Sequence, residues 1–122
     1  MKYVLMFCNT PELGDRVPAE ESEASYQEIF AWFDEHYAAG RIVDGGAELQ
    51  PATTATTVKS NGDQPLVVDG PFIESKEVVG EFTIIDVADL DAALAMAKSW
   101  PALRFPGVSV EVRPIVDHSE DS

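Results

Sequence analysis

Apolar residues at the start of the chain fill both alternating sets of positions. In residues 2–8, KYVLMFC, every residue after Lys2 is apolar. Successive side chains of a β-strand point to opposite faces of its sheet, so this run is typical of a strand covered on both faces. We therefore predict a strand here that has to be buried from two sides.

The next segment changes to the period of an α-helix. Five apolar residues between positions 19 and 39 fall within an arc of roughly 100° on a helical wheel. These residues are Tyr26, Ile29, Phe30, Phe33 and Tyr37. Three glutamates at positions 20 to 23 lie at the positive end of the helix dipole, and Gly40 can end the helix. The pattern predicts an amphipathic helix.

The remaining chain alternates strand-like and helix-like runs with turn formers between them. In order they are a short strand at 41–44 with a kink at Gly45-Gly46, a hairpin of 54–59 with 65–69 around Asn61-Gly62, a strand at 81–87, a helix capped by Asp89 and stopped by Pro101, and a strand at 108–113. The Asn-Gly pair supplies the positive φ angles that a tight hairpin needs.

This order of elements predicts an α+β fold. It matches a ferredoxin-like βαββαβ unit with an inserted β-hairpin, in a single domain over residues 1–116 followed by a polar C-terminal tail over 117–122. Both helices of such a unit lie on one face of the sheet, which leaves the other face of the first strand without cover. We expect a second copy of the chain to cover that face in a homodimer, with a cleft where the first helix, the hairpin and the partner meet.

Charge narrows the classes of partner. The 122 residues include 8 Lys and Arg against 22 Asp and Glu, a formal net charge of -14. Such a surface repels phosphate backbones and anionic lipids, which argues against nucleic-acid binding. The apolar runs are too short for a membrane span or a signal-peptide core, so we expect a cytoplasmic protein without membrane contact. Cys8 is the only cysteine, which excludes an intrachain disulfide.

A motif in the second half of the chain points to a family. Asp69-Gly70-Pro71-Phe72 is followed by the acidic stretch ESKEVVGEF, then by TIIDVADLDAALAMAKSWP and the closing VSVEVRPI. Together with MKYVLMF at the start, these segments resemble the DGPF group of YCII-related proteins over nearly the whole chain. The resemblance implies a dimeric α+β barrel built on the ferredoxin-like unit.

The same resemblance implies less about chemistry. The YCII superfamily is thought to hold a His-Asp pair in a cleft, and a few relatives act as lyases or dehydrochlorinases. Many DGPF proteins resemble partners encoded beside extracytoplasmic-function sigma factors. The short YCII proteins carry their histidine early in the first helix, where this chain has SEASYQ without a histidine. The pair therefore cannot be transferred directly onto this sequence.

His36 and Trp32 are the candidate site residues on the predicted helix. They are four positions apart, so they stack on one side of the helix at the border of its apolar arc. His36 can act as a general base because imidazole titrates near neutrality, or it can be a boundary histidine placed favourably at a helix C-terminus. Trp32 is a candidate wall of a ligand-binding cleft.

Asp69 and the residues after it are the candidates at the Gly-Pro bend. The Asp69 carboxylate can orient an imidazole or accept a proton, or it can satisfy the amides of the bend. Phe72 is a candidate wall of the cleft. Glu74 and Glu77 can assist acid chemistry and contact a ligand, or they can belong to a solvated acidic loop. Their spacing matches no established metal loop, so we expect no metal site.

Two classes of function fit these residues. The first is a module that binds a small organic ligand in an acidic cleft, or that meets a basic protein such as a sigma factor through its acidic surface. The alternative is a lyase or isomerase in which His36 and Asp69 share proton transfer. The sequence has no phosphate loop, nucleophile elbow or dinucleotide fingerprint, so we expect no cofactor.

Overall fold

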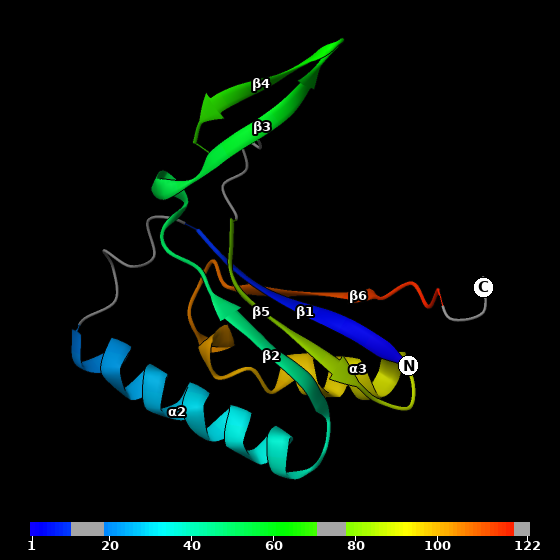
Figure 1. Ribbon diagram of the computed structural model, residues 1–122. Coiled ribbons are helices and arrows are strands. Elements are labelled where there is room, and N and C mark those ends of the chain that lie inside the picture. The colour runs from blue at the N-terminus through cyan, green and yellow to red at the C-terminus, as the bar shows by residue number, and fades with distance from the viewer. Residues whose placement is uncertain (11–18, 71–77, 119–122) are drawn as a thin grey trace.

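A four-stranded antiparallel sheet with two helices on one of its faces forms the body of the protein (Figure 1). The computed structural model describes residues 1–10, 19–70 and 78–118. Its elements are β1 Lys2–Asn9, α2 Ala19–Ala38, β2 Ile42–Glu48, the 3-10 turn η1 Ala52–Thr54, β3 Thr56–Asn61, β4 Gln64–Asp69, β5 Val78–Asp86, α3 Leu90–Lys98, the 3-10 turn η2 Pro101–Arg104 and β6 Ser109–Pro114. The order in the main sheet is β2-β5-β1-β6, an α+β arrangement compatible with a ferredoxin-like fold.

Strand β1 lies in the middle of the sheet and supplies the centre of the core. It pairs antiparallel with β5 on one side and with β6 on the other. Tyr3, Leu5 and Phe7 are buried and belong to the core cluster that also includes residues of both helices. Burial of each such side chain stabilises the fold by roughly 1.5–3 kcal/mol. One face of β1 is therefore a main contributor to stability.

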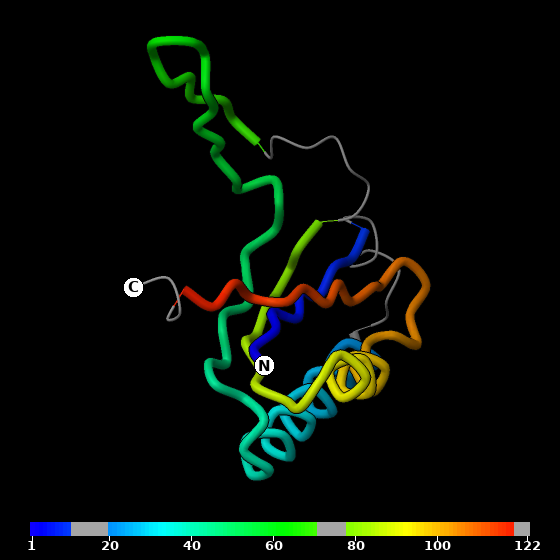
Figure 2. Tube along the Cα trace, turned by 90° about the vertical axis from the view of Figure 1, so that its right-hand side faces the viewer, coloured from blue at the N-terminus to red at the C-terminus, as the bar shows by residue number. Residues whose placement is uncertain are grey.

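The opposite face of β1 is apolar too, and within the described ranges no helix lies over it (Figure 2). Val4 and Met6 are half-buried and lie opposite Ile84 and Phe82 of β5. Residues directly opposite in an antiparallel pair share one face of the sheet. We call these four residues the outer face. Its composition explains why both alternating sets of residues 2–8 are apolar.

Helix α2 packs on the sheet through Ile29 and Phe33 of the predicted apolar arc together with Trp32 and His36 from its border. Trp32 and His36 are 4% and 6% exposed, whereas Tyr26, Phe30 and Tyr37 are 45%, 65% and 51% exposed. The Trp32 ring meets Phe7 and Trp100 edge to face, at centroid distances of 6.0 and 5.1 Å, and its indole N–H donates to Ser99 Oγ at 2.8 Å. The large indole therefore sets the rotation of the helix, because its hydrogen bond and ring contacts exist only when it faces the core.

Helix α3 packs closely on the same face of the sheet. Its buried residues are Ala93, Met96 and Ala97, and small alanine side chains permit a close approach. The Asp89 carboxylate accepts from the Ala92 N–H at 2.9 Å and caps the helix, as predicted. Neither described helix combines the length and hydropathy needed to span a bilayer.

Strand β2 reaches β5 through a glycine kink. Its register shifts between Ile42 and Asp44 and again before Ala47, as the Gly45-Gly46 pair predicted. Gly46 has φ +68°, and its N–H donates to Asp44 Oδ1 at 2.8 Å. A Cβ atom at Gly46 would lie 1.8 Å from the Phe82 carbonyl oxygen. Only glycine permits this approach, which continues the strand to Glu48.

Strands β3 and β4 form an antiparallel hairpin of their own. It projects from one end of the main sheet, away from the helices (Figures 1 and 2). The register runs from Thr56 opposite Asp69 to Asn61 opposite Gln64, and Gly62 in the turn has φ +65°. All six residues of β4 are exposed. Asp69, the last of them, therefore ends an exposed strand.

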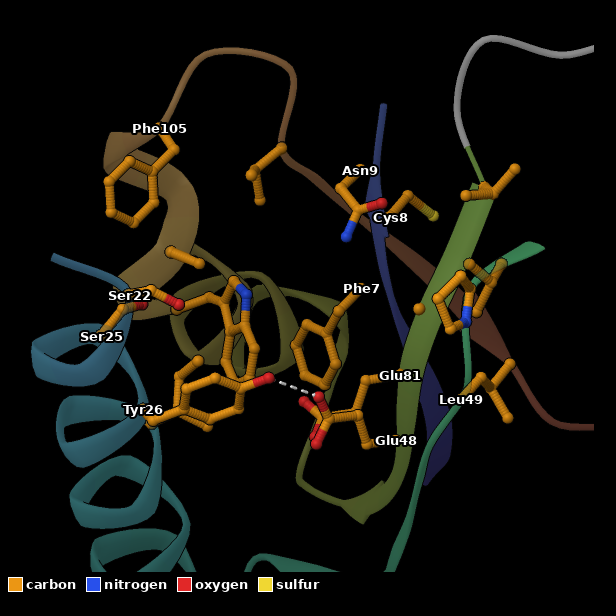
Figure 3. A pocket seen from close by; sticks show the side chains of 18 of the residues that line it. Phe7, Cys8, Asn9, Ser22, Ser25, Tyr26, Glu48, Leu49, Glu81 and Phe105 are labelled. Carbon is orange, nitrogen blue, oxygen red and sulfur yellow. Dashed lines mark hydrogen bonds between the residues drawn. The ribbon is translucent and has the colours of Figure 1, made fainter. Parts of the chain in front are cut away.

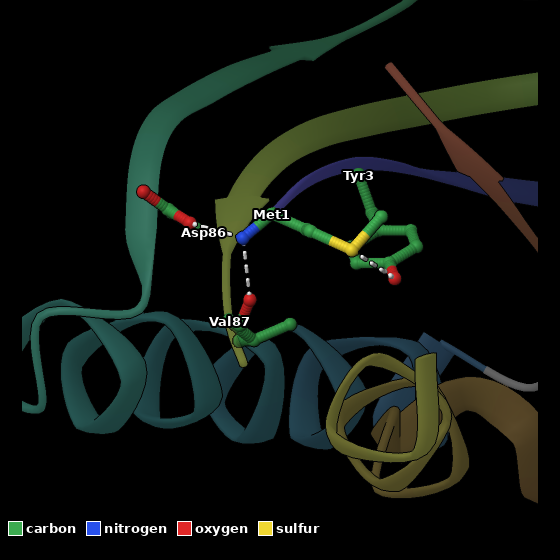
Figure 4. A network of polar contacts seen from close by, with 4 residues as sticks. All are labelled: Met1, Tyr3, Asp86 and Val87. Carbon is green, nitrogen blue, oxygen red and sulfur yellow. Dashed lines mark hydrogen bonds and ion pairs between the residues drawn. The ribbon is translucent and has the colours of Figure 1, made fainter. Parts of the chain in front are cut away.

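The amino group of Met1 anchors the start of β1 to the end of β5 (Figure 4). It donates to the Val87 carbonyl at 2.8 Å and to Asp86 Oδ1 at 3.1 Å. Both charged groups of the ion pair are more than half exposed, so its net contribution to stability is small. The contact mainly fixes the register of the two central strands at this end.

Candidate functional site

A pocket of about 750 Å³ opens between the first half of α2 and the end of the main sheet that lies away from Met1 (Figure 3). The ends of β1 and β2 and the start of β5 form one wall, and the segment around η2 forms another. Most of the large side chains in it are aromatic: Phe7, Tyr26, Phe30, Phe33, Trp100 and Phe105. This size and lining are typical of sites for small organic molecules.

The exposed aromatic stripe of α2 belongs to this pocket. Tyr26, Phe30 and Phe33 are three or four residues apart, so they lie on one side of the helix and form a continuous wall. The Tyr26 and Phe30 rings lie 6.5 Å apart, centroid to centroid. Tyr26 and Phe30 of the predicted apolar arc therefore face the cavity, whereas Trp32 and His36 pack in the core.

Two carboxylates lie on the sheet side of the pocket. Glu48 of β2 and Glu81 of β5 are directly opposite each other in the strand register, and Glu81 is in turn opposite Phe7 of β1. Tyr26 reaches from α2 and its hydroxyl donates to Glu48 Oε1 at 2.8 Å (Figure 3). Three elements thus bring an acidic pair and a phenol to one place.

Burial changes the acidity of two of these groups. Desolvation, aided by the negative charge of Glu48, raises the pKa of Glu81 from about 4.5 to about 7. The hydrogen bond to Glu48 raises the pKa of Tyr26, and burial adds to this effect. Glu81 can therefore gain or lose a proton near neutral pH, which an ordinary exposed glutamate does not do.

The described part of the pocket wall has no positive charge of its own. None of the lining residues in the described ranges is a lysine, an arginine or a histidine. Within those same ranges, no group of three or more His, Cys, Asp or Glu side chains could hold a metal ion. The acidic pair therefore has no counter-charge among the described lining residues.

The side chain of His36 is buried on the side of α2 that packs against the core. Arg41 Nη1 lies 3.0 Å from His36 Nδ1, and because a guanidinium can only donate, Nδ1 accepts and carries no proton. The ring also packs on Trp32 at a centroid distance of 4.4 Å. Burial, together with the positive charge of Arg41, lowers the pKa of His36. These contacts favour the structural interpretation of a histidine near the end of the helix.

The other predicted site residues lie away from the pocket or outside the described residues. Trp32 is part of the core, and neither it nor His36 is among the described residues that line the pocket. Asp69 is exposed at the end of β4, in a hairpin on the far side of the molecule from the last turns of α2 (Figures 1 and 2). The structure therefore does not bring His36 and Asp69 together within one chain. Phe72, Glu74 and Glu77 lie outside the described residues.

The sequence pattern placed Glu81 only within the acidic stretch after the Gly-Pro bend, and it gave no site role to Glu48 or Tyr26. One signal was available in the strand pattern. In β5, Glu81, Thr83 and Ile85 alternate on the face that points to the helices, and the latter two are buried. A carboxylate in such a set marks a cavity or a buried partner. The pairing with Glu48 depends on the β2 kink, which the sequence pattern does not specify in detail.

The family of this α+β chain follows from its similarity to known proteins. The model of the YCII-related domain matches residues 1–119. An uncharacterised protein of Rhizobium meliloti (strain 1021) is 32% identical over 115 residues, which cover 94% of this chain and 92% of the relative. The chain belongs to the YCII-related family, as its resemblance to that family predicted.

Proposed function

We propose that this YCII-related protein binds a small organic molecule in the pocket between α2 and the sheet. The observation that carries the proposal is the pocket itself, about 750 Å³ with aromatic walls and a carboxylate pair on one side. Pockets of this kind orient a ligand through a few polar groups and gain affinity from apolar contact. Glu48, Glu81 and Tyr26 are the orienting groups, and the α2 stripe supplies the contact.

The exposure of the stripe supports a role in binding. Phe30 is 65% exposed although it stands beside the core, and Tyr26 is 45% exposed. Leaving large aromatic surface in water forgoes roughly 25 cal/mol for every Å² that could be buried. A ligand that covers these rings recovers this free energy, which gives a physical reason for an aromatic wall that does not join the core.

Fluorescence titration with N-phenyl-1-naphthylamine, an uncharged aromatic probe, tests the proposal. We expect saturable binding that quenches Trp100, and we expect Phe30→Ala to weaken it at least fivefold. Val67→Ala is the matched control, because Val67 is equally exposed at 65% but lies on β4, outside the pocket. Binding that Phe30→Ala and Val67→Ala affect equally would contradict the proposal.

A second candidate function is proton-transfer catalysis, and the pKa of Glu81 near 7 favours it. In an isomerase the Glu81 carboxylate would remove a proton from a carbon acid in the pocket, and the resulting acid would return the proton to another carbon of the same molecule. In a lyase the proton loss would form a double bond as the bond to the leaving group breaks, and the resulting acid would protonate that leaving group. This role replaces the predicted His36 and Asp69 pair as the proton carrier. Turnover of a carbon acid that Glu81→Gln abolishes and His36→Gln leaves within twofold is the expected result; the reverse pattern would restore the pair.

We also propose that the chain forms a homodimer through the outer face. Val4, Met6, Phe82 and Ile84 place apolar side chains on a sheet face without a helix over it in the described chain. A second copy of the same face offers a matching apolar surface, as isologous dimers require. The basic protein partner, such as a sigma factor, stays a prediction that is based on the net charge of -14.

A further inference from the structure

We propose that the pocket selects organic cations, namely apolar molecules that carry one ammonium group, and that this group binds between Glu48 and Glu81. The inference rests on the proposed function, since it names the class of ligand that the same pocket takes. It depends on three features of the described structure: the strand register, the charge of the lining and the aromatic walls.

The register places two like charges where a sheet normally avoids them. Glu48 and Glu81 are directly opposite on neighbouring antiparallel strands. Side chains in such positions have Cβ atoms about 4.5–5.5 Å apart, and like charges there destabilise the pair. An ammonium group that donates to both carboxylates turns this repulsion into two charge-assisted hydrogen bonds.

The described part of the lining contains no basic side chain that would compete with a cationic ligand. The described lining residues include two glutamates and no basic side chain, and the ion pairs of Arg104 with Glu28 and of Arg113 with Glu111 lie elsewhere. Tyr26 donates one hydrogen bond to Glu48, which leaves further acceptor sites on both carboxylates. A cationic ligand therefore meets acceptors that no described side chain has neutralised.

The aromatic walls favour the same class of ligand. Phe7 lies opposite Glu81 in the register, and Tyr26 hydrogen-bonds to Glu48, so aromatic rings flank both carboxylates. Aromatic faces attract cations by up to about 2 kcal/mol when water is excluded. The net charge of -14 adds a long-range attraction for cations and repels anions.

Without a ligand, a proton takes the place of the cation. Burial and Glu48 hold the pKa of Glu81 near 7, so Glu81 is partly protonated at neutral pH. The charged and titratable groups that face it are Glu48 from β2 and Tyr26 from α2, while β1 presents the uncharged Phe7. Ammonium binding should therefore release a proton from Glu81, and affinity should rise as the pH increases through 7.

Calorimetric titration with three probes of matched shape tests the inference. The probes are 1-naphthylmethylamine, 1-naphthylmethanol and 1-naphthoate, which are cationic, neutral and anionic at neutral pH. We expect the amine to bind at least tenfold more tightly than the alcohol, a factor that corresponds to about 1.4 kcal/mol, and the acid to bind most weakly. Amine binding at pH 6.5 should release protons, seen as a dependence of the heat on the buffer.

Variants of the two carboxylates test whether these groups cause the preference for the amine over the alcohol. Glu81→Gln and Glu48→Gln should each reduce the preference for the amine over the alcohol at least fivefold. Asp34→Asn is the control, because it removes one exposed carboxylate from α2 outside the pocket lining. An equal loss of preference in Asp34→Asn would show a general charge effect and overturn the inference.

The outcomes separate the inference from the proposed function. If the alcohol binds as tightly as the amine and Phe30→Ala weakens both, the pocket binds organic molecules but does not select cations, and only the inference fails. If no probe binds in a way that depends on Phe30, the proposed function fails as well. Tightest binding by 1-naphthoate would also overturn the inference.

Discussion

At the scale of single residues, the chemistry of this protein is concentrated in groups whose surroundings differ from those of ordinary surface side chains. Glu81 has a pKa near 7 because it is partly buried beside Glu48. His36 is held neutral by burial and by the guanidinium of Arg41. Glu81 lines the pocket, whereas His36 packs on the core side of α2, so of these two groups Glu81 combines a shifted pKa with access to a ligand.

The raised pKa of Glu81 predicts a specific pH dependence of stability. The folded state binds its proton more tightly than the unfolded state, so this group stabilises the fold below about pH 4.5 and the effect is lost as the pH rises to about 7. Because the carboxyl is partly exposed and therefore screened by solvent, we expect a change of about 1–2 kcal/mol. Urea unfolding of the wild type and of Glu81→Gln between these pH values measures it, and parallel curves would contradict the prediction.

The lowered pKa of His36 predicts that its contribution to stability changes with pH in the opposite direction from that of Glu81. Its folded-state pKa is depressed below 6.5, so the contribution of the neutral ring is present above pH 6.5 and is lost as the pH falls through the lowered pKa. His36→Gln should therefore lose less stability than the wild type on acidification below pH 6.5. Chemical unfolding of both proteins at neutral and acidic pH measures this difference, with Glu81→Gln as the background that removes the opposing effect.

At the scale of elements, helix α2 has two apolar faces with different purposes. One face carries Trp32 and His36 into the core, and the other presents Tyr26 and Phe30 to the pocket. A single helix can do this because its aromatic residues occupy two neighbouring arcs of the helical wheel. The wheel alone does not rank the arcs, which is why the prediction assigned Trp32 to a border.

Truncation of an aromatic side chain should lower the free energy of unfolding strongly on the core face of α2 and only slightly on its pocket face. Trp32→Ala should lower the free energy of unfolding by about 3–5 kcal/mol because it leaves a cavity against Phe7 and Trp100 and removes the hydrogen bond to Ser99. Phe30→Ala should change it by no more than about 0.5 kcal/mol because the ring is mostly exposed. Urea denaturation of both variants measures the contrast, and similar losses would contradict this division of the helix.

The glycine kink in β2 predicts that stability depends strongly on Gly46. Gly46→Ala should destabilise the protein by about 2 kcal/mol or more for two reasons. The added Cβ would clash with the Phe82 carbonyl, and alanine is strained at the positive φ of this position. Gly62→Ala is the matched control: its φ is +65°, but a Cβ there meets open space, so we expect about 1 kcal/mol. Thermal unfolding compares them, and Gly46→Ala should also weaken amine binding because the kink positions Glu48.

At the scale of the whole molecule, the sheet has one covered and one open face in the described chain. The helices cover Tyr3, Leu5 and Phe7, while the outer face carries Val4, Met6 and their partners on β5. Apolar residues grouped on an uncovered sheet face are characteristic of an interaction surface, and Arg113 and Glu111 of β6 border this group opposite Val4 and Met6. The hairpin extends away from the sheet and leaves that face accessible to a second copy of the chain (Figure 2).

The open face predicts an assembly that one substitution disrupts. Sedimentation equilibrium at micromolar concentration should give twice the mass of one 13.3 kDa chain. Met6→Lys places a charge in the outer face and should shift the mass toward that of one chain, whereas Lys59→Met, a change on the hairpin, should leave it unchanged. A wild-type mass of one chain would exclude the proposed homodimer.

The α+β class, the order of the main elements and the family can be predicted from the amino-acid sequence, because these properties depend on local periodicity and on motifs along the chain. Short stretches of sequence are enough to predict three features that the structure contains. They are the two apolar sets of residues 2–8, the Asp89 cap and the Gly45-Gly46 kink. Such features need no knowledge of which segments meet.

The location of the candidate site, in contrast, depends on contacts between segments that are far apart in the sequence. Glu48 and Glu81 are 33 positions apart along the chain, and they face each other because a bulged strand places them in register. Tyr26 joins them because Trp32, by packing on Phe7 and Trp100, turns the other aromatic stripe of α2 toward the cavity. Register and helix rotation are set by long-range packing, which no single stretch of sequence encodes.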